Sequence, residues 1–183
     1  MGDTARSVID VIIEDHREVE GLFHQLDTAA DTTELRRVTD QIITELVQHS
    51  VAEEEYLYPA FRAHLEGGDE LADHEISEHA EAEKIMKQLE SMDAGDDQFR
   101  PVLDKLISEV RHHMRDEEED ALPRLAEACT PSQLAELGAQ VENAKRTAPT
   151  HPHPSAPDTP PLNKAVNASA GLVDRVRDAL RGR

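Results

Sequence analysis

The sequence predicts an all-α protein in which four long helices pair into two similar helical hairpins. Apolar residues recur at three- and four-residue steps along most of the chain, which is the period of a helix with one buried face. The 183-residue chain has no Trp, two Tyr and three Phe, and it lacks the β-branched and aromatic runs that are typical of strands. A histidine-containing segment of each helix in the first half also recurs in the second half.

Apolar stripes and helix-breaking residues locate the four helices. Gly67 and Gly68 end the second helix, and Gly95 separates the third helix from the fourth. Pro59 and Pro123 fall late in the second and fourth helices, where each should bend its helix or start a new turn. The expected bounds are Thr4–Asp27, Thr33–Leu65, Asp69–Met92 and Gln98–Ala128.

Further segments follow the four helices. A fifth helix is expected from Ser132 to Lys145, with Thr130 as its N-cap and Pro131 at the first helical position. Residues 148–163 contain six prolines and should form an extended, polyproline-like segment. A short amphipathic helix is expected from Ala168 to Leu180. The predicted organisation is a bundle with its fifth helix over 1–147, a Pro-rich linker over 148–167 and a C-terminal helix over 168–183.

Composition excludes several classes of function. The formal net charge is −20, and such an acidic surface repels phosphate backbones and anionic lipids, so nucleic acid and membranes are poor partners. Apolar runs fall short of the roughly 20 residues that span a bilayer, and the first ten residues do not form a secretory signal. Cys129 is the only cysteine, which excludes an intrachain disulfide and fits a reducing cytoplasm. We therefore expect a cytoplasmic protein, as a monomer or a weak homo-oligomer.

The histidine segments repeat in register. His16 and the glutamate four residues after it in the first helix recur 63 residues later at His79 in the third helix. His49 and Glu53 in the second helix recur 64 residues later at His113 and Glu117 in the fourth helix. The two offsets agree within one residue, so the chain contains two similar hairpins with histidines at corresponding depths.

These repeated residues predict a metal site inside the bundle. Each histidine lies on the apolar stripe of its helix, and a glutamate four residues later lies one turn on, about 6 Å along the same face. A buried carboxylate is costly without a partner or a metal, and imidazole with carboxylate ligands suits iron or manganese rather than a thiolate zinc site. The open alternative is a set of internal His–Glu salt links. The candidate metal ligands are His16, His49, Glu53, His79, His113 and Glu117.

Other polar residues near this level have open roles. Tyr56 lies seven residues after His49 on the same stripe, so its phenol could donate to bound oxygen, ligate a metal or bond to backbone. We name it as the tentative catalytic residue and expect Tyr58 to pack in the core. Glu20 and Glu83 could be ligands, acceptors that orient imidazoles, or exposed. The remaining histidines are expected outside the site, the last two in a solvated linker: His24, His64, His74, His112, His151 and His153.

The motif resembles a known family. The pattern of His16, His49-x3-Glu53, His79 and His113-x3-Glu117, each pair followed by an acidic run and a proline, is similar to the hemerythrin-like, HHE cation-binding domains over about residues 5–128. The resemblance implies an up-down-up-down four-helix bundle. It also implies a non-haem di-iron centre with two oxo- or hydroxo-bridged iron ions, iron being preferred to manganese. In that family the histidines of the motif are terminal ligands and the two glutamates bridge the metals.

The sequence also departs from the oxygen-carrying hemerythrins. Those have a second histidine where this chain has Glu83, and an H-x4-D motif where this chain has His113-x3-Glu117. A site richer in carboxylates favours oxidised metal and peroxide chemistry. We expect a di-iron protein that reacts with O2 or H2O2 in the oxidative-stress response, with catalase-like turnover as the candidate activity. The alternatives are a sensor or reservoir for O2, NO or iron without turnover, and a metal-free scaffold.

Overall fold

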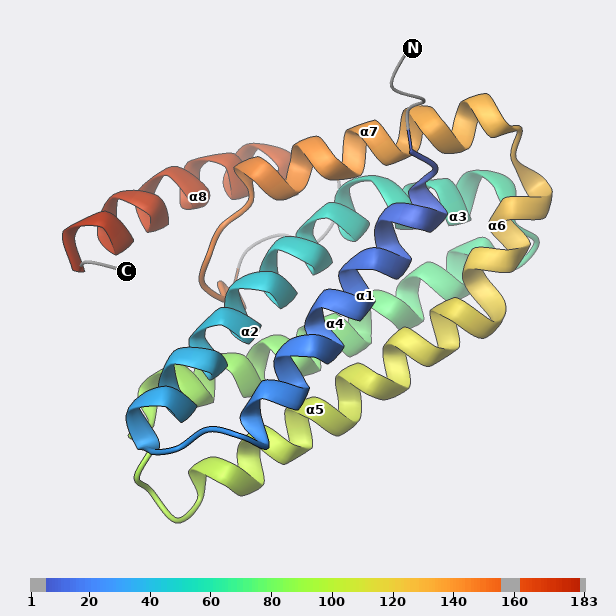
Figure 1. Cartoon of the computed structure of the whole chain (residues 1–183). Helices are drawn as coiled ribbons and strands as arrows, with labels where there is room; N and C mark the ends of the chain where they lie inside the picture. The colour runs from blue at the N-terminus through green and yellow to red at the C-terminus, as the bar shows by residue number, and fades with distance from the viewer. Residues whose placement is uncertain (1–5, 156–161, 182–183) are drawn as a thin grey trace, which may run out of the picture.

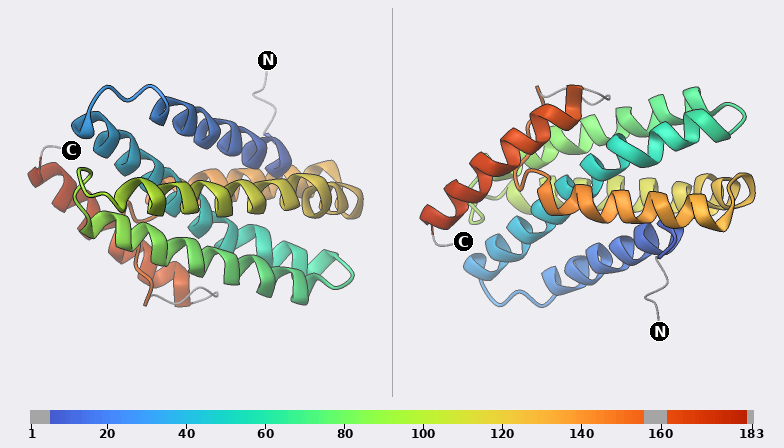
Figure 2. Two further views of the ribbon diagram at one scale, coloured as in Figure 1. Left: turned by 90° about the horizontal axis from the view of Figure 1, so that it is seen from below. Right: turned by 90° about the horizontal axis from the view of Figure 1, so that it is seen from above.

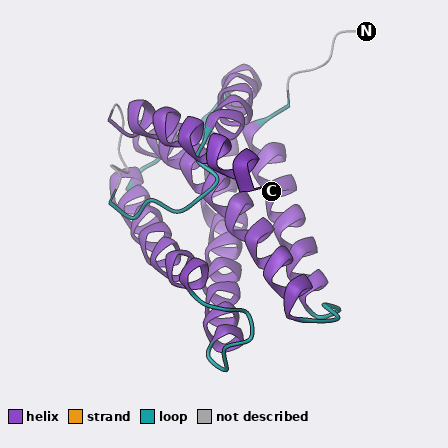
Figure 3. Cartoon of the chain, turned by 90° about the vertical axis from the view of Figure 1, so that its left-hand side faces the viewer, coloured by secondary structure: helices purple, strands orange, loops and turns teal. Residues whose placement is uncertain are grey.

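The computed structural model describes residues 6–155 and 162–181, and within these ranges every regular element is a helix (Figures 1 and 3). The first hairpin pairs α1 with α2 and the second pairs α4 with α5, so the expected four-helix bundle is confirmed. The elements are α1 (Val8–Leu26), α2 (Thr32–Ala52), η1 (Glu53–Leu57), α3 (Tyr58–His64), α4 (Gly68–Ser91), α5 (Phe99–Asp116), η2 (Glu117–Ala121), α6 (Leu122–Ala128), α7 (Pro131–Thr147) and α8 (Leu162–Arg181).

The second and fourth long helices each contain one π-helical turn. In η1 the backbone N–H of Tyr58 donates to the carbonyl of Glu53, five residues earlier, and η2 repeats this bond between Leu122 and Glu117. Pro59 and Pro123 lie one residue beyond these turns, near the start of α3 and α6. A proline lacks an N–H and its ring collides with the carbonyl four residues before it, so a wider turn accommodates it without ending the helix. The expected new turn at each proline is therefore present as a π turn.

Two apolar clusters fill the bundle on either side of a polar layer. One cluster lies toward the α1–α2 and α4–α5 loops and includes Phe23, Ile42, Leu89 and Phe99. The other lies toward the opposite end and joins α3, α6 and α7 around Phe61 and other buried side chains. The repeated histidines and glutamates occupy the level between them, so water is excluded from both directions along the bundle axis.

Helix α7 lies along the same side of the bundle as α8 and packs on α1 and α2 (Figures 1 and 2). Its start is as expected: Thr130 is the N-cap, and its side chain and that of Gln133 form a capping box. The close contact with α1 requires Gly138, because a Cβ there would stand 2.3 Å from the carbonyl oxygen of Arg6.

Part of the described chain after α7 packs on the bundle. Helix α8 begins at Leu162, six residues before its expected start, and contacts α7. His151 is buried, and its ring contacts Glu90 of α4 and Asp178 of α8. His153 Nε2 lies 3.0 Å from Asp174 of α8. The expectation that these histidines lie in solvent was therefore wrong for His151, because carboxylates of two helices surround it.

Among the helices within residues 6–155 and 162–181, none is both long enough and apolar enough to cross a membrane.

Candidate metal centre

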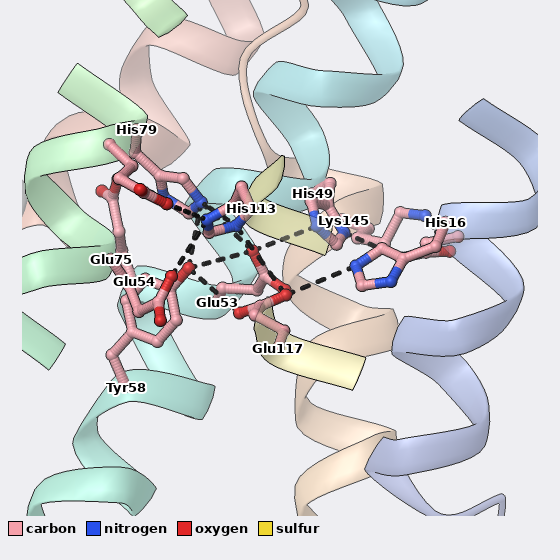
Figure 4. Close-up of polar contacts among 12 residues, drawn as sticks. His16, His49, Glu53, Glu54, Tyr58, Glu75, His79, His113, Glu117 and Lys145 are labelled. Atoms are coloured by element: carbon pink, nitrogen blue, oxygen red, sulfur yellow. Dashed lines mark hydrogen bonds and ion pairs between the residues drawn. The ribbon is translucent and has the colours of Figure 1, made fainter. Parts of the chain in front are cut away.

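The structure brings the six predicted side chains together at one level of the bundle (Figure 4). Each of the four long helices contributes one histidine, and none of the four is more than 7% exposed. The two glutamates are 0% exposed and belong to the first residues of η1 and η2. These six are His16 of α1, His49 of α2, His79 of α4, His113 of α5, Glu53 and Glu117.

All four imidazoles direct Nε2 toward the two glutamates. In the first hairpin, His49 Nε2 is 3.1 Å from Glu53 Oε2. In the second, His79 Nε2 is 3.4 Å from the same oxygen. Glu117 Oε2 lies 3.4 Å from the Nε2 of His16 and 3.7 Å from the Nε2 of His113. Each carboxylate therefore faces one imidazole from each hairpin, as a group shared between two metal positions would.

Two sets of potential ligand atoms each fit around one ion. The first half-site combines His16 and His49 with both glutamates, and its four atoms lie within 4.8 Å of one another. The second half-site combines His79 and His113 with Glu53, within the same limit. Because Glu53 belongs to both half-sites, the arrangement suits a pair of metal ions bridged by a carboxylate.

The opposite nitrogen of each ring faces a second carboxylate. Such a contact fixes the ring orientation and holds the proton on Nδ1, which leaves Nε2 for a metal. Two of these carboxylates directly precede the first histidine of a hairpin, and the other two directly follow Glu53 or Glu117. The repeat that relates the ligands therefore relates these carboxylates as well. The contacts are His16 with Glu118 (2.9 Å), His49 with Asp15 (3.5 Å), His79 with Glu54 (3.1 Å) and His113 with Glu78 (3.0 Å).

Several buried polar atoms at the centre have no hydrogen-bond partner within the described part of the chain. They include Nε2 of His16 and of His49, Oε1 of Glu53 and Oε2 of Glu117. Buried polar atoms are rarely left unsatisfied, because each costs about 1–3 kcal/mol. Imidazole nitrogens and carboxylate oxygens are ligands that first-row divalent metals accept. The residues therefore fit a metal centre, and the orphaned atoms mark where it would bind.

The second half-site is strongly polarised. Burial alone would lower the pKa of His113, but the charges of Glu117 and of the carboxylates at its Nδ1 raise it to about 10. Burial likewise raises the pKa of Glu117, but the charges of His113 and other imidazoles outweigh it and hold the value at about 2. Burial and the neighbouring charge of Glu117 raise the pKa of Glu53 well above its usual value. The pKa values of the two shared glutamates are therefore shifted in opposite directions.

The first half-site has a different balance. Burial lowers the pKa of His49 to about 4, although Asp15 at its Nδ1 opposes the shift. Burial raises the pKa of Asp15, but the contacts with His49 and Lys145 reverse this and keep the carboxyl ionised. Lys145 reaches from α7 and its Nζ lies 2.5 Å from Asp15 Oδ1. Lys145 supplies the cation that pairs with Asp15, and burial keeps the pKa of His49 low despite that neighbouring carboxylate.

The tyrosine at the centre is Tyr58, whereas we expected Tyr56. The hydroxyl of Tyr58 is 3.0 Å from His79 Nε2 and 3.3 Å from one oxygen each of Glu53 and Glu117. Tyr56 is half-buried elsewhere, with Lys164 Nζ 3.6 Å from its ring centroid. The helical period placed position 56 on the stripe, but the π turn shifts the register so that the fifth residue after Glu53 faces the centre.

The other open residues lie away from the six. Glu20 pairs with Arg111 at the surface, its Oε2 accepting from Nε at 3.0 Å. Glu83 accepts from the backbone N–H of His153 at 2.7 Å. His24 and His112 are exposed, and each lies near a carboxylate one turn away on its own helix. In this arrangement Glu20 and Glu83 contact neither half-site.

A cavity of about 150 Å³ adjoins the centre and has all four histidines in its lining. Apolar side chains from all four long helices, among them Leu46, Met86 and Val110, form much of the remaining inner wall. Glu81 and Glu109, which are exposed, also line it, so the cavity extends to the surface. It offers an apolar approach to the imidazole side of both half-sites.

Comparison with known proteins agrees with this geometry. The family model described as Hemerythrin HHE cation binding domain matches residues 7–125. The chain is 32% identical over 174 residues to an uncharacterized hemerythrin-like protein of Schizosaccharomyces pombe, covering 94% of this chain and 86% of that protein. It is 28% identical over 141 residues to a DNA nickase of Nostoc sp., covering 76% of this chain but only 39% of that longer protein.

A solved structure shares the fold. The crystal structure of a hemerythrin HHE cation-binding domain-containing protein from Mycobacterium kansasii superposes with a TM-score of 0.66, at 22% sequence identity, covering 77% of this chain and 88% of that one. At this identity the likeness establishes the fold alone. The match of the family model extends over more than half of the chain and includes all six convergent residues. The chain therefore belongs to the hemerythrin HHE cation-binding family, and its bundle is a metal-binding domain.

Proposed function

We propose that this protein binds two iron ions in the two half-sites and reacts with O2 or hydrogen peroxide. The observation that carries the proposal is the convergence of four imidazoles and two carboxylates on two positions that share Glu53, with unpartnered Nε2 atoms at the first of them. His16 and His49 would hold one ion, and His79 and His113 the other. Glu53 and Glu117 would bridge them, and the mixed nitrogen and oxygen ligands suit iron and differ from a thiolate zinc site.

The cavity limits the ligand to a small molecule. Its volume of about 150 Å³ is well below the ~300–1,000 Å³ of pockets that enclose larger organic ligands. O2, NO and hydrogen peroxide fit this space, and the apolar wall formed by Leu46, Met86 and Val110 favours neutral over charged molecules. The candidate substrate class is therefore a neutral diatomic gas or peroxide.

Tyr58 supplies a proton donor at the centre. Burial and the charge of Glu53 raise the pKa of its phenol well above the usual value, so the hydroxyl keeps its proton at neutral pH. It can donate a hydrogen bond to an oxygen atom of a bound ligand and orient it. The iron pair, when bound, would supply the redox capacity for the balanced reaction 2 H2O2 → O2 + 2 H2O, in which one peroxide is oxidised and the other reduced.

Metal analysis of the purified protein followed by an oxygen-electrode assay tests this function. We expect about two iron ions per chain and oxygen release on addition of peroxide. His49→Ala should lose iron from the first half-site and lose most of the oxygen release. His112→Ala is the matched control, because His112 is an exposed neighbour of His113 whose ring pairs with Asp116 at the surface of the same helix.

The outcomes separate the two functional classes. Two iron ions with oxygen release support peroxide turnover. Two iron ions with a reversible spectral change under O2 or NO, and no oxygen release, would replace turnover by ligand sensing or storage. A protein that binds no iron under reducing, oxygen-free loading would contradict both.

A further inference from the structure

Helix α8 lies beside α7 and turns polar side chains toward the rest of the protein (Figure 2). Asn163, Asn167 and Asp174 of this helix are buried, and none of them is more than 5% exposed. Asn167 donates to Glu55 of η1 at 3.1 Å, and Asp174 accepts from the backbone N–H of His151 at 3.2 Å. Hydrogen bonds therefore hold much of the inner face of α8.

The outer face of α8 is apolar. Val166, Leu172 and Val173 are 39%, 62% and 65% exposed, and they are the exposed large hydrophobic side chains within residues 6–155 and 162–181. Val166 and Val173 are seven residues apart, which places them two turns apart on one side of the helix. An amphipathic surface helix normally turns its apolar side chains toward the core. The reversed orientation of α8 is typical of a helix whose outer face is an interaction site.

The C-terminal helix also differs in charge from the rest of the chain. Positions 162–183 contain five Lys or Arg residues and two Asp residues, whereas the whole chain has a formal net charge of −20. The two aspartates are directed inward, where Asp174 contacts the ring of His153 and Asp178 contacts the ring of His151. An apolar helix rich in cations is attracted to the acidic surface of another copy of this chain, and that acidic surface repels an anionic membrane.

A groove of about 700 Å³ borders α8 and offers a receiving surface of this kind. Its lining comes from α1, α2, α4, α8 and the segment after α7, and it includes the apolar residues Leu22 and Ile43. The two arginines in the lining pair with carboxylates of their own helix. Glu45 of α2 is half-buried in the lining and makes no hydrogen bond or ion pair within the described part of the chain. Burial raises the pKa of Glu45, a shift that a cation from a partner would oppose.

We propose that two copies of this chain form a two-fold symmetric dimer, in which α8 of each copy lies in the groove of the other. The groove and the helix are neighbours in one copy, since Asp178 of α8 belongs to the lining, so one two-fold axis beside them relates both contacts. A helix of 20 residues is about 30 Å long, and one face of it is smaller than the ~800 Å² per partner of a stable interface. The symmetric arrangement doubles the contact and closes the assembly at two copies.

Sedimentation equilibrium of the full-length protein over a range of concentrations tests the dimer. We expect the wild type to reach twice the 20.4 kDa of one chain. Val173→Asp places a carboxylate on the outer face of α8 and should raise the Kd of the dimer ~100-fold, because a charge would be buried at the centre of the contact. Ser108→Asp adds the same charge at an exposed position of α5 and should leave the Kd unchanged.

Two further variants make the test independent of the folding of Val173→Asp and locate the receiving surface. Val173→Ala only shortens the side chain and should raise the Kd ~10-fold. Glu45→Lys replaces the carboxylate of the groove by a cation and should also raise the Kd ~10-fold, and added salt should weaken the wild-type dimer.

The inference is overturned if the wild type stays monomeric at every concentration, or if Val173→Ala or Glu45→Lys dimerises as tightly as Ser108→Asp. Co-sedimentation with phosphatidylglycerol vesicles tests the other occupant. A monomer that binds these vesicles and loses them in Val173→Asp would assign the outer face of α8 to lipid and overturn the dimer. None of these measurements depends on iron, so their failure leaves the proposed function standing.

Discussion

The two half-sites contain corresponding histidines, but the pKa values of His49 in the first and His113 in the second are shifted in opposite directions. His49 in the first is held neutral, with a pKa of about 4, and His113 in the second is held cationic, with a pKa of about 10. The carboxylate next to His49 is neutralised by Lys145, whereas His113 lies between Glu75 and Glu78. The comparison teaches that the repeat relates the ligands of the two half-sites, whereas Lys145 and Glu75, which lie outside the repeated pattern, give them different charged neighbours.

This difference has a consequence for metal uptake. A metal binds the lone pair of Nε2, so His113 must first release a proton, while His49 is already in the binding form. The second half-site, on the other hand, has more negative charge around it, which strengthens attraction for a cation once the proton has left. The first half-site is thus ready at neutral pH, and the second exchanges a proton for its ion.

The largest expected effect comes from removing what the half-sites share. Glu53→Ala deletes a carboxylate that lies against His49 and His79, so both ions should be weakened together, by more than ~100-fold. Metal analysis after dialysis should find less than one ion per chain. Glu127→Ala, on the exposed part of α6, serves as the control. Retention of one tightly held ion would mean that Glu53 does not bridge the half-sites.

The pH dependence should separate the half-sites next most strongly. In metal-free protein, His113 should remain cationic at pH 8, and His49 should remain neutral at pH 6, as ¹⁵N NMR of the imidazoles can measure. The raised pKa of His113 stabilises the metal-free fold below its unfolded pKa of about 6.5, and this is lost as pH rises toward 10.

His49 works in the opposite sense. The pKa of His49 is lower in the folded protein than in the unfolded chain. The metal-free fold therefore loses stability as pH falls from about 6.5 to about 4, because in this range the unfolded chain binds a proton and the folded protein does not. His49→Gln should flatten the acid side of the stability profile, and His113→Gln should flatten the alkaline side. Equal profiles for the two variants would remove the distinction between the half-sites.

A smaller effect should follow from making the first half-site resemble the second. Lys145→Met leaves Asp15 without its cation, so the carboxylate should raise the pKa of His49 and make a proton compete with the metal. We expect the affinity of the first ion to fall ~10-fold at pH 7 and to become more pH-dependent. Lys105→Met, at an exposed position of α5, is the control. A titration calorimeter measures both effects, and an unchanged pH dependence would contradict the role of the lysine.

The residues that could be predicted from the sequence are those inside the duplicated hairpins, and those that could not lie outside the repeat. The four helices and the six convergent residues could be predicted because they repeat with a helical period. Lys145 could not, since it meets Asp15 across 130 positions and belongs to a helix outside the repeat. Glu75 could not, because its counterpart is Ile12. The packing of His151 depends on α8, whose position no local pattern indicates.

Tyr58 shows how one backbone feature defeats a periodic prediction. A uniform α-helix places residues three, four and seven positions on along one face, which favoured Tyr56. A π turn adds a residue to one turn, and everything beyond it rotates. An acidic run precedes a proline in each hairpin, at Pro59 and at Pro123. A proline that does not end its helix is the signal in the sequence for such a turn.

The smallest expected effect tests this register directly. Tyr58→Phe removes a hydroxyl that lies within 3.3 Å of His79 and of both shared glutamates, so the metal-free protein should lose about 1 kcal/mol in the free energy of unfolding. Tyr56→Phe removes a hydroxyl from a half-buried ring beside Lys164 and should stay within ~0.5 kcal/mol of wild type. Urea denaturation measures both. If Tyr56→Phe were the more damaging change, the α-helical register would be correct and the π turn would not place Tyr58 at the centre.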